Sequence, residues 1–110
     1  MKTSTLVFVE NGSQVLLAMK KRGFGQGKWN GYGGKVKDGE SIKEAAYREL
    51  AEESGINIPT SLLSQKALID FFFEDELVFV CHIFTCPLQK EIPRETEEMR
   101  PAWYSKNALT

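Results

Sequence analysis

The sequence predicts an α/β fold of the α+β type, in which one helix packs against a small sheet. Two observations support this. Apolar, β-rich runs occur in pairs separated by turn residues, and one amphipathic stretch between the pairs carries the start and stop signals of a helix. At 110 residues, the chain is expected to form a single domain over residues 1–110 with an adequate core, and it is too short for a second domain.

The first expected element is a β-hairpin. Residues 3–10 (TSTLVFVE) and 14–20 (QVLLAMK) are rich in β-forming residues, and Asn11-Gly12 between them is a strong hairpin signal. The chain is therefore expected to open with an antiparallel pair.

A basic, glycine-rich segment follows this hairpin. Lys20, Lys21 and Arg22 precede the run GFGQGK at residues 23–28. The run does not match the G-x-x-x-x-G-K-[ST] phosphate loop. The segment is either a long exposed turn or a part of the functional site. Its position just before an acidic helix favours the site, where its cations could neutralise a polyphosphate.

The next expected element is a helix over residues 41–54. Ser41 and Glu44 form a capping-box pattern at its start, and Gly55 is a stop signal. At about 100° per residue, two carboxylates fall within the apolar face, whose members are Ile42, Ala45, Ala46, Glu49, Leu50 and Glu53.

The acids of this helix suggest a cation site. Glu49, Glu52 and Glu53 converge on one side of the helix because residues three and four apart are neighbours. A merely solvated helix would carry its acids on the face opposite the apolar residues. Carboxylates that turn toward a core are costly unless they are paired or bind a metal. Their hard oxygen atoms suit Mg²⁺, with Mn²⁺ as the alternative ion.

Two further strands are expected after the helix, at residues 66–73 (KALIDFFF) and 77–86 (LVFVCHIFTC), with an acidic turn between them. The run 71–73 consists of phenylalanines, which cannot all lie on one face of a strand. At least one ring is expected to line a pocket or meet another layer, and core packing is the expectation for any single ring. A last strand is expected at residues 99–104.

Composition and cysteine usage narrow the class of protein. The chain is 42% hydrophobic and 26% charged, and its net charge of −1 gives no indication of an extended nucleic-acid surface or of a membrane surface. Cys81 and Cys86 lack the spacing of a zinc site and are interpreted as buried strand residues. With no signal-like or membrane-spanning run, a cytoplasmic location is expected.

A longer motif runs through the predicted helix. The series Gly34, five residues, Glu40, seven residues, Arg48-Glu49-Leu50, one residue, Glu52-Glu53, one residue, Gly55-Ile56 fills every fixed position of G-x5-E-x7-R-E-U-x-E-E-x-G-U, where U is apolar. The chain therefore resembles the Nudix hydrolase family. The resemblance implies an α/β/α sandwich with a mixed sheet, and a divalent-metal-dependent hydrolase of nucleoside diphosphates linked to another group.

Residues 19–41 (MKKRGFGQGKWNGYGGKVKDGES) and 97–104 (EEMRPAWY) resemble the MutT-homologue branch of that family, purine nucleoside triphosphatases that remove oxidised nucleotides such as 8-oxo-dGTP. The resemblance implies a catalytic set of Glu49, Glu53 and Glu98. It implies a metal site made by Glu49, Glu52, Glu53 and Glu98 with the backbone of Gly34. The general base would be either Glu49 or Glu98.

The same resemblance implies roles around this centre. Lys20 would contact phosphate, Phe24 would form a wall of the base pocket, and Asn30 would hydrogen-bond the purine edge, for which an amide offers both a donor and an acceptor. The alternative for Asn30 is a turn-forming residue. Glu40 and Arg48 would orient the ligands rather than act in catalysis.

The resemblance fails beyond the last strand. The resembling enzymes continue with a Trp-Pro-Asp-Asp segment that reads the purine and with a second helix that covers the sheet, whereas this sequence stops at Thr110. The second covering helix is thus expected to be missing or truncated, and a homodimer is expected to shield the face it would hide.

The expected function is Mg²⁺-dependent hydrolysis of a nucleoside triphosphate, normal or oxidised, to the monophosphate and pyrophosphate. Two alternatives stay open. One is a Nudix hydrolase for a dinucleotide polyphosphate, a nucleotide sugar or a capped nucleic-acid end. The other is a catalytically silent nucleotide-binding module.

Overall fold

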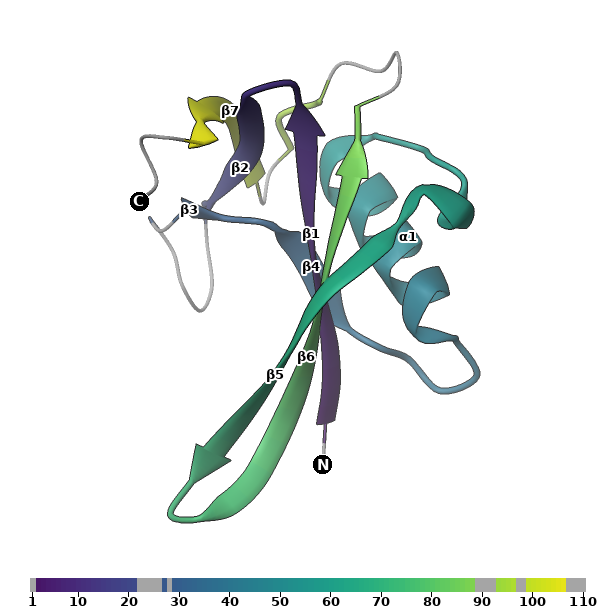
Figure 1. Ribbon diagram of the computed structural model, residues 1–110, viewed down its shortest axis with the longest axis vertical. Coiled ribbons are helices and arrows are strands. Elements are labelled where there is room, and N and C mark those ends of the chain that lie inside the picture. Colours follow the sequence, from purple (N-terminus) through teal and green to yellow (C-terminus); the bar gives the residue numbers. More distant parts are fainter. Residues whose placement is uncertain (1, 22–26, 28, 89–92, 97–98, 107–110) are drawn as a thin grey trace.

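The computed structural model describes residues 2–21, 27, 29–88, 93–96 and 99–106. Figure 1 shows a helix packed against a long, twisted sheet. The elements are β1 Lys2–Asn11, β2 Gln14–Lys20, β3 Trp29–Asn30, β4 Tyr32–Lys35, α1 Ile42–Ser54, the 3-10 turn η1 Thr60–Leu62, β5 Ser64–Phe73, β6 Glu76–Pro87 and β7 Met99–Ser105.

The sheet is mixed, and β1 is its central strand. On one side β1 pairs with β6 in parallel, and on the other side it pairs antiparallel with β2 and with β4. The strand order is β3-β2-β1-β6-β5, with β7 pairing with β2. The opening β1–β2 hairpin, the β5–β6 hairpin and the last strand occur as predicted, within a few residues at their ends.

The helix also has the predicted ends. Ser41 accepts a hydrogen bond from the N–H of Glu44 at 3.1 Å, and the Glu44 side chain accepts one from the N–H of Ser41 at 3.0 Å, which completes the capping box. Gly55 ends the helix in the left-handed region, at φ 77°, where glycine has no steric cost. The prediction of a helix over 41–54 is confirmed.

The core lies between α1 and one face of the sheet. Leu50 and Ala46 from the helix meet Val7 and Phe84 from the two central strands, and all four are almost fully buried. Burial of their apolar surface stabilises the fold by about 25 cal/mol for each square ångström that is removed from water. Cys81 and Cys86 are free and buried as predicted, and burial, followed by the charge of Glu10, raises the pKa of the Cys86 thiol to about 12.

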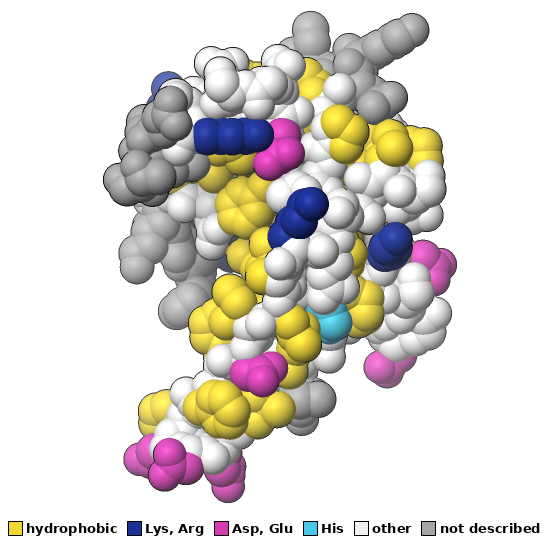
Figure 2. Space-filling model, viewed as in Figure 1, with side chains coloured by type: hydrophobic (Ala, Val, Ile, Leu, Met, Phe, Trp, Pro, Cys, Tyr) yellow, Lys and Arg dark blue, Asp and Glu magenta, His cyan; other side chains and the backbone are white. Residues whose placement is uncertain are grey.

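The other face of the sheet and the β5–β6 hairpin differ from the core. In the described part of the chain, no α-helix covers this face. The hairpin extends beyond the rest of the sheet (Figure 1), and Figure 2 shows hydrophobic side chains along it and acidic side chains at its tip. The expectation of core packing for the phenylalanines is wrong, because Phe71, Phe72 and Phe73 are 40%, 62% and 68% exposed.

No helix in the described ranges is long and apolar enough to cross a membrane.

Candidate active site

The site is built where β4 passes between β1 and α1. A side chain at Gly33 would overlap the carbonyl oxygen of Thr5, since a Cβ there would lie 1.8 Å from it. A Cβ at Gly34 would lie 2.7 Å from the carboxylate carbon of Glu49. Two successive glycines therefore let the backbone of β4 touch the central strand and an acid of the helix at once.

Two glutamates of α1 meet this glycine pair. Glu53 is 9% exposed, and its Oε1 accepts a hydrogen bond from the N–H of Gly33 at 2.9 Å. Glu49 lies against Gly34, with its side chain 17% exposed. The structure thus brings the two carboxylates of the apolar face to the same short stretch of backbone. Glu52 is one turn after Arg48 on a more exposed side, at 57%.

Arg48 holds the acids of the motif in one network. Its guanidinium bonds both oxygens of Glu40, with Nε–Oε2 at 2.6 Å and Nη2–Oε1 at 3.0 Å. Its Nη1 bonds Glu49 Oε1 at 2.7 Å and reaches Glu52 Oε2 at 3.4 Å, while Nη2 also donates to the Lys35 carbonyl at 3.1 Å. The two bonds to Glu40 fix the orientation of the Arg48 guanidinium, and this guanidinium in turn positions the Glu49 carboxylate.

The network changes the acidity of its members. The side-chain hydrogen bonds from Arg48, and after them the backbone N–H of Lys37 at 2.8 Å, lower the pKa of Glu40 from 4.5 to about 2. In the same network, the side-chain hydrogen bonding to Glu40 raises the pKa of Arg48 above its usual range. Both groups are therefore charged at neutral pH, and they act as fixed supports.

Among the residues that the structure describes, no three Asp, Glu, His or Cys side chains are placed to hold a metal ion together. The donors that are present nevertheless fit a hard divalent ion. Mg²⁺ is commonly held by one or two carboxylates together with water and substrate phosphates. The Glu49–Glu53 pair at Gly33 and Gly34 supplies such a pair of oxygen ligands.

Lys20 and Asn30, two of the residues predicted to contact substrate, lie at the ends of β2 and β3. Lys20 is the last residue of β2 and pairs with Met99 of β7. Met99 directly follows Glu98 in the sequence. Asn30 is exposed, and its Oδ1 accepts a hydrogen bond from the N–H of Gly31 at 2.8 Å. Phe24 and Glu98 lie outside the described residues.

Tyr32 is a residue of this region that sequence reasoning missed. It is fully buried one position before the glycine pair, and its hydroxyl has no hydrogen-bond partner in the described part of the chain. Burial, and in second place the charge of Glu53, raise the pKa of this hydroxyl well above its usual range. The sequence shows that Tyr32 directly precedes the two glycines in the run YGGK. It does not show that the side chain points toward the helix, because this depends on the pairing of β4 with β1.

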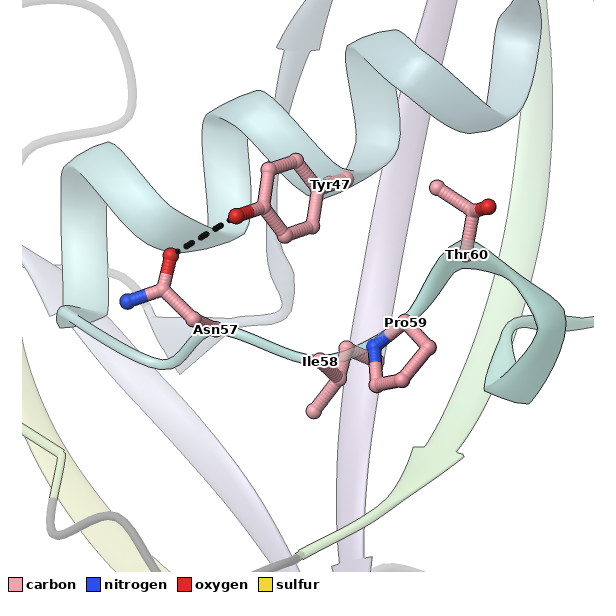
Figure 3. Close-up of a pocket in the computed structure, with 5 residues that line it drawn as sticks. All are labelled: Tyr47, Asn57, Ile58, Pro59 and Thr60. Carbon is pink, nitrogen blue, oxygen red and sulfur yellow. Dashed lines mark hydrogen bonds between the residues drawn. The ribbon is translucent and has the colours of Figure 1, made fainter.

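Two surface hollows lie beside α1. The first, of about 380 Å³, is lined by Tyr47 and residues 57–60, and Figure 3 shows the Tyr47 hydroxyl donating to Asn57 Oδ1, at 2.9 Å. No carboxylate lines it. The second, of about 460 Å³, has three cations and one acid in its lining, namely Lys2, Lys35, Lys37 and Asp38. Because Lys35 directly follows Gly34, this basic hollow is the one that suits an anionic group.

The comparison with known proteins agrees with this geometry. A family model for the NUDIX domain matches residues 2–110, a span that contains the glycine pair, the acidic helix and Arg48. The chain belongs to the NUDIX domain family. The complete NUDIX motif predicted from the sequence is thus the part of the chain that forms the carboxylate and arginine network.

Two curated proteins are similar to this chain over most of its length. An oxidized purine nucleoside triphosphate hydrolase from Danio rerio is 50% identical over 103 residues, which cover 94% of this chain and 65% of that protein. The protein of the same name from Mus musculus is 49% identical over 105 residues, which cover 96% of this chain and 67% of that protein. The chain spans about two thirds of the length of these relatives.

Solved NUDIX structures share the fold. A MutT NUDIX hydrolase from Burkholderia pseudomallei superposes with a TM-score of 0.81 at 22% identity, covering 94% of this chain and 82% of that one. A MutT protein from Methanosarcina mazei Go1 superposes with a TM-score of 0.80 at 22% identity, covering 98% and 79%. The predicted fold class, a mixed sheet with a packed helix, is confirmed.

Proposed function

We propose that this chain, as a single domain over residues 1–110, hydrolyses purine nucleoside triphosphates, with oxidised purines as the favoured class, to the monophosphate and pyrophosphate. The observation that carries this proposal is the placement of Glu49 and Glu53 against Gly33 and Gly34, inside a complete NUDIX motif. The substrate class follows from the names of the two relatives of about half identical sequence.

Mg²⁺ is the proposed cofactor, with Mn²⁺ as the alternative. Glu49, Glu52 and Glu53, together with the Gly34 backbone and Glu98, would hold it. When bound, the ion would neutralise charge on the polyphosphate and polarise the anhydride that breaks. Arg48 Nη1 contacts Glu49 at 2.7 Å and Glu52 at 3.4 Å, and so helps to position both carboxylates.

The proposed reaction is substitution by water at phosphorus. The water oxygen forms a bond to phosphorus, the anhydride P–O bond breaks, and pyrophosphate leaves with the electron pair of that bond. The water proton passes to a carboxylate, for which Glu49 and Glu98 are the candidates. In this mechanism Glu40 and Arg48 position Glu49 and do not touch the substrate.

Binding of the nucleotide would use the residues around this centre. Lys20 is proposed to contact phosphate, Asn30 to bond the purine edge, and Phe24 to pack on the base. The basic hollow lined by Lys2, Lys35 and Lys37 would attract the distal phosphates, since these three cations outnumber the one acid in its lining, Asp38.

We further propose a cytoplasmic location and self-association as a homodimer. The two free, buried cysteines agree with a reducing compartment. The exposed apolar side chains of the β5–β6 hairpin favour a second copy that covers them.

The test of the hydrolase proposal is pyrophosphate release from a panel of nucleotides, with and without Mg²⁺. The panel contains normal and oxidised purine triphosphates, a dinucleotide polyphosphate and a nucleotide sugar. Glu53→Gln keeps an oxygen that can accept the Gly33 N–H but removes the charge, so it should fold normally and lose turnover by about 100-fold or more.

Glu44→Gln is the matched control. It makes the same chemical change in the same helix, and glutamine also completes a capping box, so turnover should stay normal. A Glu53→Gln variant that turns over at a near-normal rate would reject the assignment. Nucleotide binding without any release would instead support a silent binding module.

A further inference from the structure

Among the described strands, β5 lies at one edge of the sheet. It is the terminal strand in the order β3-β2-β1-β6-β5, and β6 is its only partner among the described strands. All ten of its residues are exposed. A long edge strand presents a row of free N–H and C=O groups, and natural proteins usually cover or interrupt such an edge.

This edge is also apolar on both faces. Leu68, Ile69, Phe72 and Phe73 are 43% to 68% exposed, and Phe71 stacks on Phe79 of β6 with ring centroids 4.3 Å apart. Figure 2 shows a hydrophobic surface along the projecting hairpin. A contiguous apolar patch of this kind marks an interaction surface in a soluble protein.

The regular part of the edge is short and defined. The pairing of β5 with β6 shifts register between Gln65 and Ala67 and again between Phe71 and Phe72. Between these irregularities, residues 67–71 pair continuously. An added strand would therefore find its uninterrupted template around residues 67–71.

The charges of β5 select one partner and one register. Lys66 and Asp70 are the only charged residues in this strand; Asp70 lies within the continuous stretch, and Lys66 lies just before it, at the irregularity between Gln65 and Ala67. If a second copy pairs antiparallel with the two Leu68 residues opposite each other, Lys66 of each copy faces Asp70 of the other. Centring the pair on Lys66 or on Asp70, or running the strands in parallel and in register, would place like charges together.

The same arrangement explains the lysine on an apolar edge. A lysine at such an edge disfavours pairing with an unrelated strand, because its ammonium group would then be buried without an opposite charge beside it. A second copy of this strand supplies an acid in the required place. The tip of each β5–β6 hairpin carries Glu74 and Asp75. When two copies pair antiparallel, the two tips lie at opposite ends of the paired strands and so do not repel each other.

We propose that two copies of this chain join by antiparallel pairing of their β5 strands about Leu68, with two Lys66–Asp70 pairs across a two-fold axis. The joint continues the sheet from one copy into the other and is isologous, so it closes at a dimer. This inference rests on the proposed self-association and is independent of the proposed hydrolysis.

Charge-swap variants test the joint. By sedimentation equilibrium, the wild type should shift with rising concentration from 12.4 kDa to twice that mass. Lys66→Asp alone and Asp70→Lys alone should each weaken the dimer by about tenfold or more, because each creates two like-charge contacts. An equimolar mixture of these two variants should dimerise again, since each Asp or Lys then faces its opposite.

Lys43→Asp, on the exposed side of α1, changes net charge by the same amount as Lys66→Asp and should leave the dimer intact. Circular dichroism and pyrophosphate release check that each variant is folded and test hydrolysis separately. A wild type that stays monomeric at every concentration overturns this inference and the homodimer together. If both single variants dimerise as strongly as the wild type, the β5 joint alone is overturned, since the copies then meet through another surface.

Discussion

At the scale of single residues, the site depends on one arginine that bonds three carboxylates. Arg48 contacts Glu40, Glu49 and Glu52, and only the contact with Glu40 uses two nitrogen atoms. The Glu40–Arg48 pair is therefore the fixed end of the network, and Glu49 is the end that faces the glycine pair. Removing Glu40 should release Arg48 without touching the proposed metal ligands.

The acidity of Glu40 gives a pH test of this network. Its pKa falls from 4.5 to about 2 on folding, so its contribution to stability is present above pH 4.5 and is lost as the pH falls toward about 2. Glu40→Gln should thus be less stable than the wild type at neutral pH, and the difference should shrink between pH 4.5 and 2. Urea unfolding across this range measures it.

Glu95, whose pKa is also lowered, remains in both proteins and cancels in that difference. Glu44 cancels only in part, because the charge of Glu40, which opposes the lowering of the Glu44 pKa, is absent from Glu40→Gln. A stability difference between wild type and Glu40→Gln that stays constant from neutral pH to pH 2 would contradict the assigned role.

At the scale of elements, sequence patterns predicted local structure well and exposure poorly. Capping residues set the ends of α1, and the Asn-Gly signal located the first hairpin to within one residue, since its turn is Gly12-Ser13 and Asn11 still pairs with Gln14. The phenylalanines at 71–73 were expected in the core. Alternation indicates which rings share a face, but it does not reveal that the hairpin extends past its neighbouring strands.

The capping box offers a prediction for the helix as a whole. Ser41→Ala removes the acceptor for the Glu44 N–H at the start of α1 and should lower the free energy of unfolding by about 1 kcal/mol. Ser41→Asp keeps a capping acceptor and should restore most of the loss. Chemical denaturation of the three proteins at pH 7 provides the comparison, and equal stability of Ser41→Ala and wild type would show that the cap is not needed.

At the scale of the whole molecule, the site joins segments that are far apart in the chain. The motif predicted the acids and Arg48, because they lie on one helix and one preceding loop. The pairing of Lys20 with Met99, the close approach of β4 to Thr5 and the burial of Tyr32 all depend on the assembled sheet. Spacing along the chain carries no information on such contacts, so they could not be predicted from it.

Because these parts meet only in the folded chain, binding at the site should stabilise the whole fold. A non-hydrolysable purine triphosphate with a methylene bridge between its first two phosphates, at 100 times its dissociation constant with Mg²⁺, should add about 2.7 kcal/mol. For a domain of this size that corresponds to a rise in Tm of about 10 °C. Thermal unfolding followed by circular dichroism measures the shift, and chelation of Mg²⁺ should remove most of it.

Glu53→Gln should show a much smaller shift, because it removes a charge from the proposed metal site, whereas the control Glu44→Gln should shift like the wild type. The shift reports binding without requiring turnover, so it separates loss of the metal site from loss of a catalytic group. A wild-type shift that is the same with and without Mg²⁺ would place the nucleotide away from the glutamates, and the metal-site assignment would then be wrong.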